Sequence, residues 1–164
     1  MGAGKTTVGL ALAHRLGWRF VDLDDVVEEQ EGSAIEEIFR VRGEAGFRQA
    51  EKQALLAVLA QPDVRSLVLA VGGGAFVQPE NAAALQQAGL RVVFLDASAD
   101  ELRRRCTEQG GRPRPLLGDE PRFRQLYEQR RASYMKADLR VETTGLDPGD
   151  TAAAILRNLK SEGA

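Results

Sequence analysis

The stretch Gly2-Ala3-Gly4-Lys5-Thr6-Thr7 near the start of the chain decides the fold class. It matches the second half of the phosphate-binding P-loop pattern, G-x-x-x-x-G-K-[ST]. In that pattern the glycines let backbone N–H groups close on phosphate oxygens, the lysine reaches the β- and γ-phosphates, and the hydroxyl binds Mg²⁺. The six residues are therefore the candidate nucleotide-binding loop, with Lys5 as the phosphate ligand and Thr6 as a Mg²⁺ ligand.

The first glycine of the pattern would lie two residues before Met1, and the strand that normally leads into the loop would also lie there. The sequence therefore predicts a nucleotide-binding kinase domain whose first strand is missing from this chain. A start codon placed too late and a truncated form both account for the gap.

Apolar strands and helices alternate along the rest of the chain. After the P-loop, apolar side chains repeat at helical spacing at Val8, Ala11, Leu12 and Leu16, and Gly17 ends that helix. The later predicted strands are 20–24, 66–71, 91–96 and 139–143. Helices are predicted at roughly 33–42, 46–60, 79–88 and 121–133. Two more helices are marked by their first residues: one is capped by Ser98 and Glu101, and the other begins at Asp147 and Pro148. This order predicts an α/β fold of the P-loop NTPase type, with a doubly wound parallel sheet flanked by helices.

Composition limits the classes of function. The chain has 164 residues, of which 28% are charged and 43% hydrophobic, and we expect a single domain over 1–164. A net charge of −2 favours neither nucleic acid nor an anionic membrane. No apolar run approaches a membrane span, and the N-terminus lacks the layout of a signal peptide. We expect a cytoplasmic, monomeric enzyme that binds neither nucleic acid nor membrane.

Two carboxylates end the predicted strand 20–24. Ligands of open α/β sheets bind outside the carboxyl ends of the strands, so one of Asp22 and Asp24 could face a metal and the other an acceptor hydroxyl. Both side chains share one face only if the strand persists to Asp24. The alternative is that Asp24 or Asp25 caps the helix that follows.

Glycines and arginines supply the other candidates. Gly72, Gly73 and Gly74 follow a buried strand, where they either break the strand into a loop or let the backbone approach a ligand. Arg48 lies just inside a predicted helix, and a solvated helix-face arginine is the default expectation. Residues 108–121 are rich in Gly, Pro and Arg and suit a closing lid, which would bring Arg112 or Arg114 onto the transferring phosphoryl group.

Five strings in order resemble the shikimate kinase family from Met1 to about residue 160. They are residues 1–7, Phe20-Val-Asp-Leu-Asp24, Ile38-Phe39 with Gly43-Glu44-x-x-Phe47-Arg48-x-x-Glu51, Gly72-Gly-Gly74, and Arg114-Pro-Leu-Leu117 with Arg130-x-x-x-Tyr134. The resemblance implies transfer of the ATP γ-phosphate to the 3-hydroxyl of shikimate. It also implies a five-stranded parallel sheet, whose central strand is the missing one, with a lid at about 108–121 and a substrate-binding helical region at about 25–61.

The resemblance further implies roles for individual residues. Asp24 would orient the acceptor hydroxyl or act as its base, and Asp22 would contact Mg²⁺ through water. Arg48 and Arg130 would bind the shikimate carboxylate, and the three glycines would line the shikimate pocket. Arg114 would reach the phosphates from the lid, and Arg105 would lie against adenine. Arg131 is a one-residue alternative to Arg130, which is chosen because it keeps the four-residue step to Tyr134.

Two other functions stay open on the sequence. One is a P-loop kinase for another small acceptor, such as gluconate or a nucleoside monophosphate, against which Asp24, Arg48 and the triple glycine argue. The other is a shikimate-kinase-like ligand-sensing domain attached to a helix-turn-helix regulator.

Overall fold

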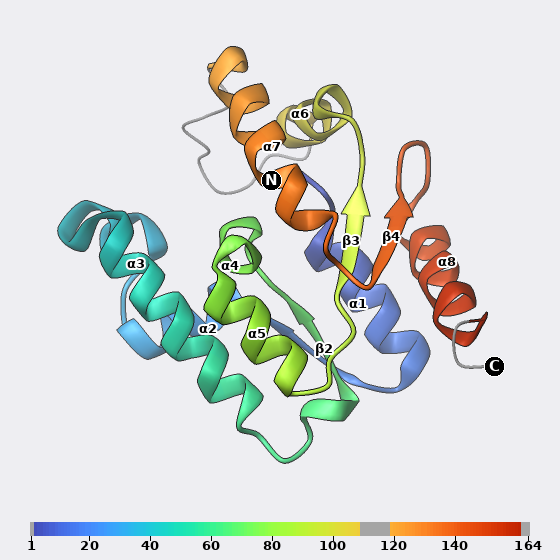
Figure 1. The fold of residues 1–164 in the computed structure, drawn as a ribbon, viewed down its shortest axis with the longest axis horizontal. Coiled ribbons are helices and arrows are strands. Elements are labelled where there is room, and N and C mark those ends of the chain that lie inside the picture. The colour runs from blue at the N-terminus through green and yellow to red at the C-terminus, as the bar shows by residue number, and fades with distance from the viewer. Residues whose placement is uncertain (1, 109–118, 162–164) are drawn as a thin grey trace. The chain divides into compact units, whose positions relative to one another are not determined.

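A computed structural model describes residues 2–108 and 119–161 of the chain (Figure 1). The chain forms two compact units, one made of Met1–Leu12 with Val92–Ala164 and the other of Ala13–Arg91. The first helix, α1 (Lys5–Leu16), contributes residues to both units. The expectation of a single domain over 1–164 stays a prediction.

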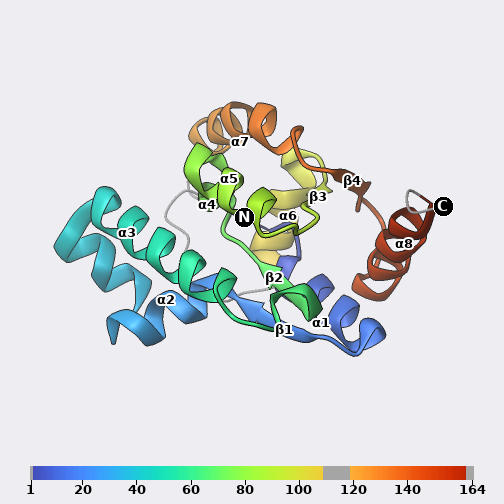
Figure 2. The same cartoon turned by 60° about the horizontal axis from the view of Figure 1, so that its bottom comes forward.

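Within the described residues, the strands form two parallel pairs. In the unit 13–91, β1 (Arg19–Asp22) pairs with β2 (Leu67–Ala70), with Val21 opposite Leu69 (Figure 2). In the other unit, β3 (Val93–Asp96) pairs with β4 (Leu139–Glu142), with Leu95 opposite Val141. Helices lie in the connection between the strands of each pair, as parallel pairing requires. This arrangement confirms the predicted α/β fold with parallel strands and flanking helices.

The unit 13–91 is built around α3. Its helices are α2 (Leu23–Glu31), α3 (Ile35–Leu59), α4 (Gly73–Val77) and α5 (Pro79–Gln87), with a short 3-10 turn η1 at Val64–Ser66. α3 packs against α2, α4 and α5. The buried stripe of α3 includes Phe47, Ala50, Ala54 and Val58, and its backbone leaves helical geometry at Gly43, between the predicted helices 33–42 and 46–60.

The strand 20–24 is shorter than predicted. β1 ends at Asp22, and Leu23 begins α2. The Asp22 carboxylate accepts the backbone N–H of Asp24 at 3.1 Å, which makes Asp22 the N-cap of α2. The expectation that one strand carries both carboxylates was therefore wrong, and the capping residue is Asp22 rather than Asp24 or Asp25.

The helices of the unit 1–12/92–164 have side-chain caps at their N-termini. They are α6 (Ala99–Glu108), α7 (Glu120–Tyr134) and α8 (Pro148–Ser161), of which α8 packs on β4. Ser98 Oγ accepts the N–H of Glu101 at 3.2 Å, as the predicted cap requires, and Asp147 Oδ1 accepts the N–H of Asp150 at 2.8 Å. Ala97, Leu102 and Phe123 form a buried cluster against which Ala3 packs.

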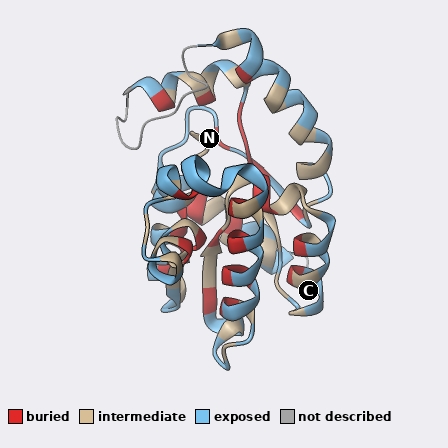
Figure 3. Cartoon of the chain, turned by 90° about the vertical axis from the view of Figure 1, so that its left-hand side faces the viewer, coloured by how far each residue is buried: buried red, intermediate tan, exposed pale blue. Residues whose placement is uncertain are grey.

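Helix faces divide into buried and exposed sides. In Figure 3 the buried residues of the helices lie along one side of each helix, and the opposite side is exposed. Leu23, Val27, Ala54 and Leu55 are completely buried. Within residues 2–108 and 119–161, none of the helices combines the length and apolar character that a membrane crossing needs.

The cap of α2 gives a first testable prediction. Asp22→Ala removes the capping oxygen and should lower the free energy of unfolding by about 1 kcal/mol, whereas Asp22→Asn keeps an oxygen and should lose only a few tenths. Urea denaturation followed by circular dichroism measures both variants. Equal losses in the two variants would contradict the capping role.

Candidate functional site

The P-loop residues form a tight turn that leads directly into α1. Gly2 has φ 70°, and a Cβ built there would lie 2.8 Å from the Sγ of Cys106 on α6, so that only glycine fits. Thr7 Oγ1 donates to the carbonyl of Gly4 at 3.0 Å, and the Val8 N–H donates to the same carbonyl at 2.8 Å. The residues that lead into α1 thus form a turn that packs against α6.

The start of α1 suits a phosphate chemically. The first N–H groups of an α-helix have no partner within the helix, and the helix dipole favours an anion at that end. Lys5 is half-buried, and within the described residues it forms no ion pair with a carboxylate. A cationic side chain and helix N–H groups therefore stand at one place, as phosphate binding requires.

The donor set also fits Mg²⁺ bound together with a nucleotide. Among the described residues, no group of three or more His, Cys, Asp or Glu residues could hold a metal ion by itself. Mg²⁺ is usually bound by one or two protein oxygens together with water and substrate phosphates. The exposed hydroxyl of Thr6 and the carboxylate of Asp22 are oxygen donors of that kind, although they belong to different units.

Four predicted site residues of the unit 13–91 are brought together in what we call the Arg48 cluster. It comprises Asp24 on α2, Arg48 and Glu51 on α3, and Gly72 and Gly74 at the start of α4. A Cβ on Gly72 would lie 3.0 Å from Glu51 Oε1 and 3.6 Å from Asp24 Oδ1. Three segments far apart in the sequence therefore meet at one place.

Arg48 is the centre of this cluster and is largely buried. Its side chain is 19% exposed, and Nη1 donates to Glu51 Oε2 at 2.7 Å, while Nη2 reaches Glu44 at 3.3 Å. The guanidinium carbon lies 5.1 Å from the centroid of the Phe47 ring. The default expectation of a solvated arginine was wrong, because the nearly fully buried Glu51 draws the guanidinium inward.

Arg48 keeps hydrogen-bonding capacity for a ligand. An arginine has five N–H donors, and the hydrogen bonds to Glu51 and Glu44 engage two of its nitrogens. Its Nε is buried and has no hydrogen-bond partner in the part of the chain that the structure describes. A buried donor left in this state is rare and marks a place where a partner is expected.

Gly74 makes room for the guanidinium. A Cβ at this position would lie 2.5 Å from Arg48 Nη1 and 2.6 Å from Cζ, which is closer than any real contact. The glycine run also differs from a simple strand-to-loop break, because Gly72 is the N-cap of α4 and Gly73 begins that helix. The group that approaches the backbone of Gly74 in the structure is thus the side chain of Arg48, and the approach of a ligand to the glycines stays a prediction.

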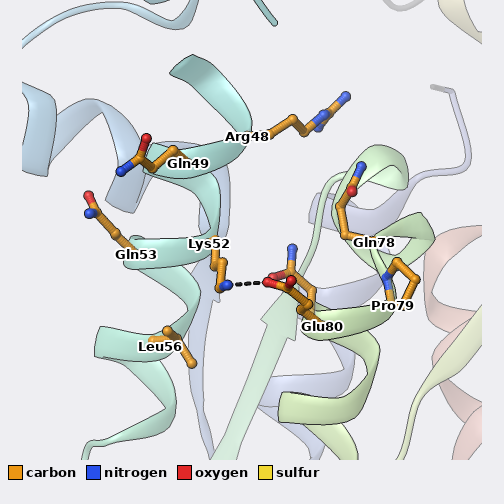
Figure 4. A pocket seen from close by; sticks show the side chains of 9 residues that line it. Arg48, Gln49, Lys52, Gln53, Leu56, Gln78, Pro79 and Glu80 are labelled. Carbon is orange, nitrogen blue, oxygen red and sulfur yellow. Dashed lines mark hydrogen bonds and ion pairs between the residues drawn. The ribbon is translucent and has the colours of Figure 1, made fainter. Parts of the chain in front are cut away.

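A pocket of about 480 Å³ lies beside the cluster (Figure 4). It is formed by one face of α3 and the start of α5, and its lining residues are Arg48, Gln49, Lys52, Gln53, Leu56, Gln78, Pro79, Glu80 and Asn81. Lys52 and Glu80 form an ion pair across it. Both cations of the lining thus have carboxylate partners, and Arg48 is the residue that the pocket shares with the Arg48 cluster.

The predicted adenine ligand Arg105 is firmly held on α6. Its Nε donates to Glu101 at 2.7 Å, and its two terminal nitrogens donate to Thr143, at 3.1 Å to Oγ1 and at 2.6 Å to the carbonyl. The side chain is 13% exposed. Hydrogen bonds from Arg104 and Arg105 lower the pKa of Glu101 from 4.5 to about 2.

The structure distinguishes Arg130 from Arg131. Arg131 pairs with the buried Asp96 at 3.2 Å, and its hydrogen bond with Tyr127 raises the pKa of the guanidinium. Arg130 is half-buried and forms no ion pair within the described residues. This difference favours Arg130 as the residue available to a ligand. Arg112 and Arg114 lie outside the described residues.

Sequence reasoning missed Glu51 and Asp96. Glu51 was present in the family string but received no role, although a carboxylate three residues after Arg48 and on the buried stripe of a helix is a signal of an internal ion pair. Asp96 ends an apolar strand, which is also an unusual place for a charge. Both are nearly fully buried.

Comparisons with known proteins show the family of the chain. The sequence model of one family, described as shikimate kinase, matches residues 1–160. The chain belongs to the shikimate kinase family. A shikimate kinase of Synechococcus elongatus is 46% identical over 98% of this chain and 83% of its own length, and one of Persephonella marina is 37% identical over 98% and 94%.

Solved structures of the family have the same fold. The structure described as shikimate kinase from Acinetobacter baumannii in complex with shikimate has a TM-score of 0.88 and 36% identity, and the match covers 99% of this chain and 89% of that one. The structure from Bacteroides thetaiotaomicron has a TM-score of 0.87 and 30% identity, with 98% and 94% covered. The family and the fold class predicted from the sequence are therefore confirmed.

The low pKa of Glu101 predicts a specific pH dependence. Since the folded-state pKa is depressed, its stabilisation is present above the unfolded-state value near 4.5 and is lost as the pH falls through about 2. Glu101→Gln should therefore lower the free energy of unfolding by ~1–3 kcal/mol at pH 7. Urea titrations between pH 7 and pH 2 should show the difference from the wild type shrinking; a constant difference would contradict the interpretation.

Proposed function

We propose that this chain transfers the γ-phosphoryl group of ATP to the 3-hydroxyl of shikimate, which yields shikimate 3-phosphate and ADP. Membership of the shikimate kinase family supports the proposal, and so does the similarity to an Acinetobacter baumannii enzyme described in complex with shikimate. The activity belongs to the biosynthesis of aromatic amino acids. A steady-state assay of ADP release with shikimate, and with gluconate as the negative control, tests it.

The Arg48 cluster is the observation that carries the proposal. Shikimate has a carboxylate at one end and hydroxyls at the other, so its site needs a fixed cation and a hydroxyl acceptor. Glu51 fixes the guanidinium of Arg48, whose Nε is buried and without a partner among the described residues. A forked guanidinium binds a carboxylate through two parallel hydrogen bonds. Arg48 would therefore hold the carboxylate of shikimate.

Asp24 would orient the acceptor hydroxyl or take its proton. It lies in the first turn of α2, and its Oδ1 would be 3.6 Å from a Cβ on Gly72, next to the Glu51 carboxylate. Phosphoryl transfer asks a protein mainly for positioning and charge stabilisation, and a carboxylate that accepts the substrate hydroxyl supplies the first. Gly72, Gly73 and Gly74 would contact shikimate beside Asp24 and Arg48.

The proposed ligands of ATP itself are residues of the unit 1–12/92–164. Residues 2–7 would wrap the phosphates, with Lys5 on the β- and γ-phosphates, and Arg105 would lie against adenine. Thr6 and Asp22 would hold Mg²⁺, which when bound neutralises charge on the phosphates. Arg130 would be a further ligand of the shikimate carboxylate, and Arg114 from the segment 108–121 would reach the transferring group. A monomeric state and a cytoplasmic location also stay proposals.

Arg48→Ala should chiefly raise the KM for shikimate. Loss of a charge-assisted contact is worth ~1.5–3 kcal/mol, which corresponds to roughly 10- to 150-fold in KM. Initial rates at varied shikimate measure it. Arg40→Ala on the same helix is the control, because Arg40 is exposed and pairs only with Glu37 among the described residues, and its KM should be unchanged. An unchanged KM in Arg48→Ala would refute the role of Arg48.

Gly74→Ala should raise the same KM through displacement of Arg48. The new Cβ would meet the end of a flexible side chain, so the guanidinium would have to move. If the effect passes through Arg48, the double variant Gly74→Ala/Arg48→Ala will be no worse than Arg48→Ala alone. Additive losses in kcat/KM would contradict this coupling.

Lys5→Met should abolish turnover and leave shikimate binding intact. The lysine acts on the phosphates of ATP, so its loss should lower kcat by roughly 100-fold or more. Isothermal titration with shikimate should give a Kd within about twofold of the wild type. Retained turnover would mean that Lys5 is not the phosphate ligand.

A further inference from the structure

A buried network in the unit 1–12/92–164 joins Arg105, a proposed ligand contact, to Arg131, the neighbour in sequence of the proposed ligand contact Arg130. Its centre is Asp96, the last residue of β3, which is 3% exposed. The side chain of Asp96 faces Arg131 on α7 and Arg140 on β4. Its backbone carbonyl accepts two hydrogen bonds from Thr143, from the N–H at 2.8 Å and from Oγ1 at 3.0 Å.

The side-chain arm of this network fixes α7. Asp96 Oδ2 accepts from Arg131 at 3.2 Å and from Arg140 at 2.7 Å. Tyr127, one turn before Arg131, donates its hydroxyl to the carbonyl of Ala97 at 2.9 Å, and burial raises the pKa of that hydroxyl. Two side chains of α7 are thus anchored at the end of β3, and Arg130 is the next residue to one of them.

The backbone arm fixes α6. Thr143 is 1% exposed, and its Oγ1 and carbonyl both accept from Arg105. The Thr143 hydroxyl therefore links the guanidinium of Arg105 to the end of β3. The two arms leave Asp96 through different atoms, the carboxylate and the carbonyl, so that one can be removed without the other.

We propose that Asp96 and Thr143 are positioning residues for the kinase reaction, Asp96 aligning Arg130 with the acceptor through Arg131, and Thr143 aligning Arg105 with the nucleotide. The proposal rests on the function proposed above. Neither residue touches a ligand, because both are buried among side chains of their own unit. Misplacement of a binding group by about 1 Å lowers the rate by up to about 100-fold, so such anchors have measurable effects.

Substitution of each arm should affect one substrate only. Asp96→Asn keeps the size of the side chain but removes the charge that Arg131 faces, and it should raise the KM for shikimate roughly tenfold while the KM for ATP stays within about twofold. Thr143→Val removes the hydroxyl, and it should raise the KM for ATP while leaving the KM for shikimate nearly unchanged. A purely structural role would instead lower the melting temperature and change both KM values together, which would overturn the proposal.

A matched pair of variants isolates the contribution of α7. Arg131→Gln and Arg140→Gln each remove one cation from the same oxygen of Asp96, but only Arg131 is on α7 beside Arg130. Arg131→Gln should raise the KM for shikimate, and Arg140→Gln should not. Equal KM values in the two would overturn the proposal, and this comparison also replaces Asp96→Asn if that variant does not fold.

Two results separate failure of this proposal from failure of the function. Wild-type protein that releases no ADP with shikimate refutes the proposed function itself. Active wild type, with a raised KM in Arg130→Gln but an unchanged KM in both Asp96→Asn and Arg131→Gln, overturns the positioning role alone. A lowered KM in Asp96→Asn would also overturn it, because that result would mean that Arg131, released from Asp96, is itself the ligand.

Discussion

The ion pair between Glu51 and Arg48 is the constraint on which the unit 13–91 depends. Glu51 is 1% exposed, and a carboxylate so deeply buried is tolerated only with a cationic or hydrogen-bonding partner. The pair turns the guanidinium away from solvent and onto Gly74, where a methyl group would collide with it. Buried pairs of this kind often add little or no net stability, because desolvation offsets their attraction. Its value therefore lies in the fixed orientation that it gives to Arg48.

The other unit uses the same physical device. Asp96 is also a nearly fully buried carboxylate that faces arginine, and it stands at the end of a strand, next to the elements that carry the proposed ligand contacts. In both units a buried acid fixes a helical arginine: Glu51 and Arg48 lie on the same helix, whereas Asp96 ends a strand and Arg131 lies on α7. The difference is that Glu51 holds the proposed ligand-binding arginine directly, whereas Asp96 holds the residue beside it.

Local signals allowed much of the fold to be predicted, and side-chain contacts were harder. The P-loop glycines, the Ser98 and Asp147 caps and the apolar runs depend on nearest neighbours in sequence, and they predicted the helices and parallel strands well. The end of β1 was misplaced because Asp22 suits both a strand and an N-cap, and only the hydrogen bond to Asp24 decides between them. The burial of Arg48 depends on Glu51 and on a glycine 26 residues later, a contact that helical spacing does not reveal.

Because Gly2 packs closely against Cys106 on α6, the reactivity of this cysteine, the only one in the sequence, reports how often the proposed nucleotide-binding loop opens. Cys106 is 4% exposed and lies directly beneath Gly2, so that a thiol reagent gains access only when the turn lifts or the helix frays. When such openings close faster than the reagent reacts, the labelling rate is proportional to the fraction of open molecules. The thiol of Cys106 is thus a chemical reporter of local opening at the proposed phosphate-binding turn.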